Sequence, residues 1–279
     1  MEQTLEEQPS VFPGLRDRLC RITFSLILIS LIYSFYSHTL TSQLLKPVLI
    51  FPSNDLTYWV IHLTRLPAII TGHLAIAVAF DLILFLSCVW CILHPQRRVW
   101  PVLFFIFYLL YFVIFNSYGL FHAHKRVGVL LLPIPFMMAG DRSFLLIWKG
   151  LRYYVCYIYG TAFLWKLFRG SGFYGQQAVL IIKRNLTAYL YYDPGSLLSK
   201  IYSWMILHPQ VPALLSAAGF MLEGLFIIGF FTRRMDRGLF LLSIILPLGF
   251  LFMADTLFLE LIFLAICFYD LPAGKQVRR

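Results

Sequence analysis

Charged residues are scarce in this sequence. They make up 13% of the 279 residues, about half of the ~25% that is usual in soluble domains. The formal net charge is +10. The basic residues stand singly or in pairs between apolar runs, so we interpret them as topology signals of a membrane protein and expect no nucleic-acid partner. The shortage of charge excludes a soluble globular domain.

Cysteine is also scarce, and its positions exclude a disulfide framework. The sequence has five cysteines, an odd number, and four of them fall inside apolar runs. Cys88 and Cys91 have the C-x-x-C spacing of redox pairs and lie on nearly the same helix face. A thiol to quinone oxidoreductase is therefore one hypothesis. Since no second cysteine pair follows on the outward side to pass electrons on, we interpret both thiols as structural.

Long apolar runs take the place of charge. Hydrophobic residues make up 60% of the chain, and the mean hydropathy is +0.78. A helix needs ~20 apolar residues to cross the hydrocarbon core, where all its backbone polar groups must be paired internally. The sequence therefore predicts an all-α fold, a polytopic transmembrane helical bundle with about eight spans. The expected spans are residues 22–38, 70–93, 100–120, 126–140, 150–168, 211–231, 237–253 and 255–270.

The whole chain, 1–279, is expected to form a single transmembrane domain. With the N-terminus inside, about 14 lysines and arginines fall in short cytoplasmic segments and about 8 in longer loops on the other side, as the positive-inside rule favours. We therefore expect a multi-pass protein of the cell membrane whose polar tail 1–18 and basic tail 271–279 are both cytoplasmic. The segments 39–69 and 169–210 then face outward and carry short interfacial helices.

Ionisable residues inside the predicted spans mark candidate sites, because a charge is costly at membrane depth. They are Asp81, Lys166, Glu223, Asp255 and Glu260, with His122 and His124 at the outward end of the third span. Lys166 lies about two residues from the outward end of its span. It is either an interfacial anchor next to Trp165 or a desolvated amine whose neutral form acts as a base.

The two histidines and Glu223 extend this candidate site. His122 and His124 share the outward side with Lys166, but an H-x-H pair alone lacks a third ligand at regular spacing, so we predict no metal site. Glu223 follows the small residues Ala217, Ala218 and Gly219, which favour close helix packing. Its carboxylate is expected to face the bundle, either as a structural hydrogen-bond acceptor or as a catalytic acid.

The order of these features resembles a known family. Phe115-Asn116 is followed by His124 before a short apolar stretch, and then by Tyr159-Gly160-Thr161-Ala162-Phe163-Leu164-Trp165-Lys166-Leu167, the Gly-rich segment Gly172-Phe173-Tyr174-Gly175 and the acid Glu223. This pattern, over about residues 115 to 235, is similar to the membrane domain of the vitamin K-dependent gamma-carboxylase family, also called the horizontally transferred transmembrane (HTTM) domain. The resemblance implies that Lys166 is the base toward a reduced quinone, that His124 or His122 assists, and that Glu223 is a recurring acid.

Three hypotheses for the function follow. The first is an HTTM-type enzyme, carboxylase-like or a peptide-modifying lyase, that acts at Lys166 on a secreted peptide or a quinone-like lipid. The second is a non-catalytic membrane partner for the maturation, export or immunity of a secreted peptide, in which Lys166 is an anchor. The third is a small-solute transporter, for which the spans have too few polar positions to line a path.

Overall fold

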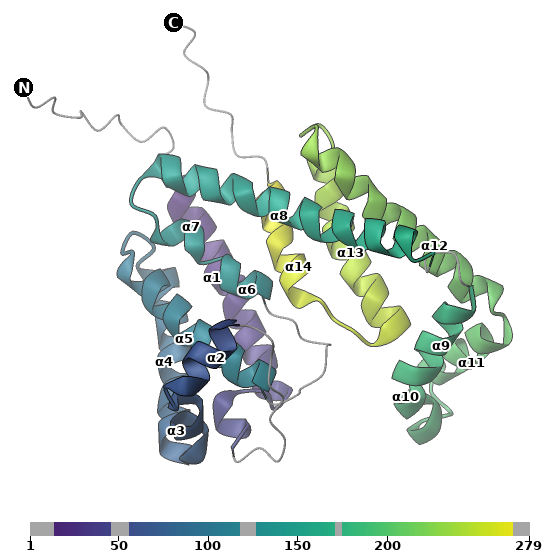
Figure 1. Cartoon of the computed structure of the whole chain (residues 1–279), viewed down its shortest axis with the longest axis horizontal. Coiled ribbons are helices and arrows are strands. Elements are labelled where there is room, and N and C mark those ends of the chain that lie inside the picture. The colour runs from purple at the N-terminus through teal and green to yellow at the C-terminus, as the bar shows by residue number, and fades with distance from the viewer. Residues whose placement is uncertain (1–13, 46–55, 118–126, 171–174, 270–279) are drawn as a thin grey trace, which may run out of the picture. The chain divides into compact units, whose positions relative to one another are not determined.

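The computed structural model (Figure 1) describes residues 14–45, 56–117, 127–170 and 175–269. Every regular element within these ranges is a helix, so the all-α prediction is confirmed. Contacts divide the chain into two compact units. The described residues of unit 1 fall within 14–117 and 132–147, and those of unit 2 within 127–131 and 148–269, so the long helix α8 (Asp141–Phe168) contributes to both units. The single transmembrane domain stays a prediction.

Five helical segments of the described chain are long and apolar enough to cross a membrane. They are Leu15–Gln43, Leu74–Leu93, Val99–Asn116, Gln210–Phe230 and Asp236–Ala254. These segments suit a lipid bilayer and a multi-pass arrangement, because each has the length and apolar composition that a spanning helix needs. The predicted count of eight spans is not confirmed.

Proline explains the form of the expected span 126–140. In this stretch the structure has two short helices, α6 (Val127–Leu131) and α7 (Ile134–Met137). Pro133 and Pro135 interrupt a continuous helix, since a proline lacks the backbone N–H and its ring clashes with the preceding turn. Neither piece is long enough to cross a bilayer by itself.

Two further expected spans also differ from a simple crossing helix. The stretch 255–270 contains α14 (Leu259–Leu264) and the 3-10 helix η5 (Ala265–Phe268), which together are shorter than a span. The stretch 150–168 is the second part of α8, a helix of 28 residues. Its length is sufficient, but charged residues interrupt its apolar face, and it is not one of the five segments.

Unit 1 is organised around α4. Its elements are α1 (Leu15–Tyr36), η1 (Thr41–Gln43), α2 (Leu56–Leu63), α3 (Leu66–Gly72), α4 (Leu74–Leu93), α5 (Val99–Ser117), α7 and the start of α8. α4 packs against both α1 and α5. Phe24 of α1 is fully buried and lies edge-on to Phe104 of α5, with ring centroids 5.4 Å apart. Aromatic packing of this kind stabilises the unit beyond the burial of area alone.

Asp81, one of the predicted membrane-depth acids, has a structural position in unit 1. Its two carboxylate oxygens accept the backbone N–H groups of Thr41 at 3.2 Å and Ser42 at 2.8 Å. The first N–H groups of a helix have no partner within it, and a carboxylate is a favourable acceptor for them. Asp81 on α4 therefore holds the start of η1.

Unit 2 contains the candidate site. Its elements are α6, the larger part of α8, α9 (Gly175–Asn185), α10 (Thr187–Tyr192), α11 (Leu197–Leu207), α12 (Gln210–Gly224), η4 (Leu225–Phe230), α13 (Asp236–Ala254), α14 and η5. α13 packs against α12, α14 and η5. α9 packs against α12 and α13, and α10 and α11 pack against α9, as the green part of Figure 1 shows.

The helices α9 to α11 occupy the segment for which the sequence predicts short amphipathic helices. Their apolar sides meet in a small core of Ile182, Leu186, Tyr202 and Met205. Tyr202 donates its hydroxyl hydrogen to the carbonyl of Phe252 on α13 at 3.1 Å. The helical form is thus confirmed, and the expected position at the membrane interface stays a prediction.

Glycines allow α8 to approach α12 and η4 closely. A Cβ added at Gly224 would lie 3.0 Å from the Phe163 ring, and one at Gly229 would lie 2.6 Å from the Cys156 sulfur and 2.8 Å from the Leu239 side chain. Small residues at helix contacts are the usual device for close packing in membranes. Because of this close packing, side chains of α8 lie in contact with α12 and η4.

Candidate functional site

The last turn of α8 carries Lys166. The helix ends at Phe168, and Gly170 follows with a positive φ of 65°. Glycine adopts this left-handed conformation without a steric penalty, which makes it the preferred residue just beyond a helix end. The N–H of Gly170 donates to the carbonyl of Leu167 at 3.0 Å. A lysine in the last turn also suits the negative end of the helix dipole.

Lys166 and Glu223 form an ion pair. The Lys166 Nζ lies 2.5 Å from Oε1 and 2.7 Å from Oε2 of Glu223, so it donates to both carboxylate oxygens. The Glu223 side chain is only 2% exposed, whereas the Lys166 side chain is 36% exposed. The prediction that the Glu223 carboxylate faces the bundle is therefore supported, and the partner is Lys166, 57 residues away in the chain.

Aromatic rings surround this pair. Phe163, one turn before Lys166, stacks on Phe220 of α12 with centroids 4.6 Å apart and planes 23° apart. The Lys166 Nζ also lies 5.5 Å from the ring centroid of Phe250 on α13, within the range of a cation–π contact. The ammonium group is thus held between a carboxylate and a ring, in surroundings that are largely apolar.

Tyr159 adds a buried hydroxyl to the same face of α8. Its ring stacks on Phe226 of η4 with centroids 4.2 Å apart, and the residue is 2% exposed. Its hydroxyl has no hydrogen-bond partner within the described part of the chain. Because Tyr159 precedes Lys166 by seven residues, about two helical turns, the two side chains project from the same side of α8.

The other predicted site residues have different locations. His122 and His124 lie outside the described residues. Asp255 ends α13 in the left-handed conformation with φ 49°. Glu260 is buried on α14. It lies against Gly128 of α6, because a Cβ added at Gly128 would collide with the Glu260 Cβ. Lys166 and Glu223 are therefore the two predicted residues that the structure brings together.

The cysteines form no bond with one another. All five are buried free thiols. The Cys88 thiol donates to the carbonyl of Phe24 at 3.3 Å, and the Cys20 thiol donates to the carbonyl of Cys91 at 3.6 Å. These contacts join α1 to α4, as expected for thiols that pack as small apolar residues.

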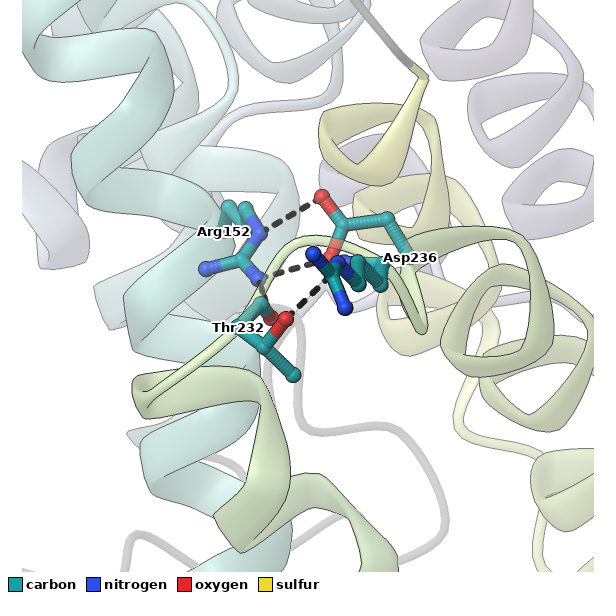
Figure 2. A network of polar contacts seen from close by, with 4 residues as sticks. Arg152, Thr232 and Asp236 are labelled. Atoms are coloured by element: carbon teal, nitrogen blue, oxygen red, sulfur yellow. Dashed lines mark hydrogen bonds and ion pairs between the residues drawn. The ribbon is translucent and has the colours of Figure 1, made fainter.

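A second ion pair in unit 2 was not predicted from the sequence. Arg152 donates from Nε to one oxygen of Asp236 at 2.9 Å and from Nη2 to the other at 2.6 Å, and Nη2 also donates to the carbonyl of Thr232 at 3.0 Å (Figure 2). Both charged residues are buried, with Arg152 3% and Asp236 8% exposed. The pair joins α8 to the turn between η4 and α13.

One signal for this second pair is present in the sequence. Asp236 is the single acid among Arg233, Arg234 and Arg237. The positive-inside bias gives no reason for an acid at this position, so Asp236 is the residue of this turn that indicates a structural role. Arg152 itself was interpreted as another cytoplasmic topology signal.

No three or more side chains of His, Cys, Asp and Glu come together as metal ligands within the ranges that the structure describes. The comparisons with protein-family models, with curated proteins and with solved structures find no match for this chain. The fold and the two ion pairs are therefore interpreted from their own chemistry.

Proposed function

We propose that this chain is a multi-pass cell-membrane protein of the HTTM type, with about eight spans and with both termini in the cytoplasm. Its outward-facing site is the pair of Lys166 and Glu223, which acts on a secreted peptide or a quinone-like lipid. The observation that carries this proposal is the pairing itself, since a partly exposed lysine donates to both oxygens of a buried carboxylate.

The pair has the chemistry of a proton acceptor. Direct hydrogen bonds of 2.5 and 2.7 Å connect Nζ to the two oxygens, so a single proton can move from the ammonium group to the carboxylate. In apolar surroundings the separated charges of an ion pair are poorly solvated, which brings the neutral pair of amine and carboxylic acid closer in free energy. The exposed side of the neutral amine can then accept a proton from a substrate. The proton given up by the amine stays on Glu223.

The residues near Lys166 fit the reduced quinone that the family resemblance implies. The amine of Lys166 would hold a ring oxygen, and the ring of Phe250 would contact the apolar body. A reduced quinone, when bound, supplies an acidic hydroxyl and reducing equivalents. In this chain Lys166 would accept the proton and Glu223 would retain it.

The test uses the full chain in proteoliposomes supplied with vitamin K hydroquinone, oxygen and bicarbonate. We expect wild-type protein to consume the hydroquinone, as followed by chromatography. Lys166→Met removes the amine and Lys166→Arg keeps the charge but cannot act as a base, so both should lower the rate by about 10² to 10⁴. Glu223→Gln should also lower it. Lys149→Met, at an exposed lysine of the same helix, is the matched control and should keep the wild-type rate.

The non-catalytic partner protein is the second candidate. The contact of Lys166 with the Phe250 ring, in addition to its ion pair, is also typical of an anchor that holds helices together. An arginine preserves both contacts. Wild-type protein that leaves the hydroquinone unchanged, or Lys166→Arg with the wild-type rate, would contradict the enzymatic proposal and favour the partner.

A further inference from the structure

The turn between η4 and α13 lies where two membrane segments end. The apolar segment Gln210–Phe230 stops just before it, and Asp236–Ala254 starts just after it. A connection this short keeps its residues close to the level at which both helices leave the hydrocarbon core. In a bilayer that both segments cross, residues 231–235 would lie at the depth of the lipid headgroups.

Three arginines of this region are exposed and carry no acidic partner. Arg233, Arg234 and Arg237 are exposed, and none of them forms an ion pair in the described part of the chain. The one acid nearby, Asp236, has both carboxylate oxygens occupied by Arg152. Within the residues that the structure describes, the positive charge of the three arginines is thus left without an acidic partner.

The buried pair also fixes the shape of the turn. Arg152 donates to the carbonyl of Thr232, and the Thr232 hydroxyl accepts the backbone N–H of Arg234 at 3.2 Å. Figure 2 shows Arg152 reaching Thr232 and Asp236 from the adjacent helix. In the sequence these two residues stand on either side of Arg233 and Arg234. The backbone that carries the arginines is therefore held before a ligand binds, so only their side chains need to be ordered on binding.

Apolar side chains of the same turn are exposed beside the arginines. Phe231 is 85% exposed and Met235 is 44% exposed. A free phosphate ion offers nothing for these side chains to contact, whereas a lipid offers acyl chains directly below its headgroup. Arginine binds phosphate oxygens by two parallel hydrogen bonds, and exposed aromatic side chains sit favourably at the membrane interface.

We propose that the turn of Arg233, Arg234 and Arg237 binds the headgroup phosphate of an anionic phospholipid, with Phe231 and Met235 against its acyl chains. This lipid site involves none of the residues assigned to the proton-accepting pair, so it stands independently of the proposed function. Each basic residue near an anionic surface contributes on the order of 1 kcal/mol, and three together correspond to about a hundredfold in affinity.

The experiment measures binding of phosphatidylglycerol and of phosphatidylcholine with the same acyl chains to the purified full chain, by native mass spectrometry. We expect wild-type protein to prefer phosphatidylglycerol. The triple variant Arg233→Gln, Arg234→Gln, Arg237→Gln should lose affinity for phosphatidylglycerol by about a hundredfold and should bind phosphatidylcholine as before. The matched control removes the same charge elsewhere, at exposed residues of α9 and α11, with Lys183→Gln, Arg184→Gln and Lys200→Gln. It should keep the preference.

Three results would overturn the lipid site. The first is wild-type affinity for phosphatidylglycerol in the triple arginine variant, and the second is an equal loss in the control variant, which would mean that net charge alone decides binding. The third concerns the source of the phosphate: if inorganic phosphate displaces phosphatidylglycerol at millimolar concentration, the turn binds a free ion and not a lipid.

Discussion

The two ion pairs of unit 2 use the same helix for different purposes. Lys166 and Arg152 both extend from α8 and are 14 residues apart, or about 21 Å along the helix axis. The side chain of Lys166 is 36% exposed, while that of Arg152 is 4% exposed. A partly exposed cation can meet a substrate, whereas a cation buried with its partner holds the fold. The difference in exposure therefore separates a candidate site from a structural connection.

The contacts of the two cations support the same distinction. Arg152 reaches both oxygens of Asp236 and the Thr232 carbonyl, and its guanidinium lies 5.1 Å from the ring of Tyr153 and 5.8 Å from that of Phe268. The planar guanidinium matches a carboxylate with two parallel hydrogen bonds, and it does not lose its proton in proteins. A lysine amine is smaller and can give up its proton, which suits the position that is open to a substrate.

The largest effect is expected when the enclosed pair is broken. Arg152→Met leaves the Asp236 carboxylate buried without its partner, and such a change costs about 3–5 kcal/mol of stability. The double variant Arg152→Met, Asp236→Leu removes both charges and should recover most of that loss. Unfolding of the purified protein in mixed micelles with increasing denaturing detergent measures both. If Arg152→Met unfolds at the wild-type midpoint, the pair does not hold α8 to the turn.

A smaller effect is expected at the close contact between the two pairs. Gly229→Ala places a Cβ within 2.6 Å of the Cys156 sulfur and 2.8 Å of the Leu239 side chain, so α8 and η4 must separate slightly, at a cost of about 1–3 kcal/mol. Gly219→Ala is the control, because no atom lies within 4 Å of its added Cβ. The same unfolding measurement compares the two. Equal midpoints for Gly229→Ala and wild type would show that α8 does not need this close approach.

The sequence predicts the separate members of the candidate site better than their pairing. Lys166 and Glu223 each stand out as a charge within an apolar stretch, which composition alone reveals. Their contact depends on the rotation of α8 and α12 about their axes and on the room that Gly224 leaves for Phe163. No periodicity within either helix contains this information, because it arises only when the two helices pack.

The same reasoning explains why the count of eight spans is not confirmed and why the partner of Arg152 was not predicted. Apolar content predicts the all-helical fold, whereas the expected span over 126–140 contains Pro133 and Pro135, which leave two short helices there. Arg152 follows Lys149 at the start of the expected span 150–168, so it was counted among the cytoplasmic topology charges. In the structure it is buried because Asp236, 84 residues later, compensates its charge.

The smallest effect is expected at the ring beneath Lys166. Phe250→Leu keeps an apolar side chain of similar reach but removes the ring face that lies 5.5 Å from Nζ, and a cation–π contact of a partly exposed lysine contributes about 0.5–1 kcal/mol. A double-mutant cycle with Lys166→Met isolates this contribution, because loss of packing is common to both backgrounds and cancels. We expect Phe250→Leu to cost about 0.5–1 kcal/mol more in wild type than in the Lys166→Met background.

Arg152→Met is the control for this cycle, because Arg152 is flanked by two rings of its own. The stability losses of Phe250→Leu and Arg152→Met should be additive in the double variant. A coupling of zero between Phe250 and Lys166 would leave Glu223 as the partner that positions the amine, and would sharpen the contrast with the ring-flanked guanidinium of Arg152.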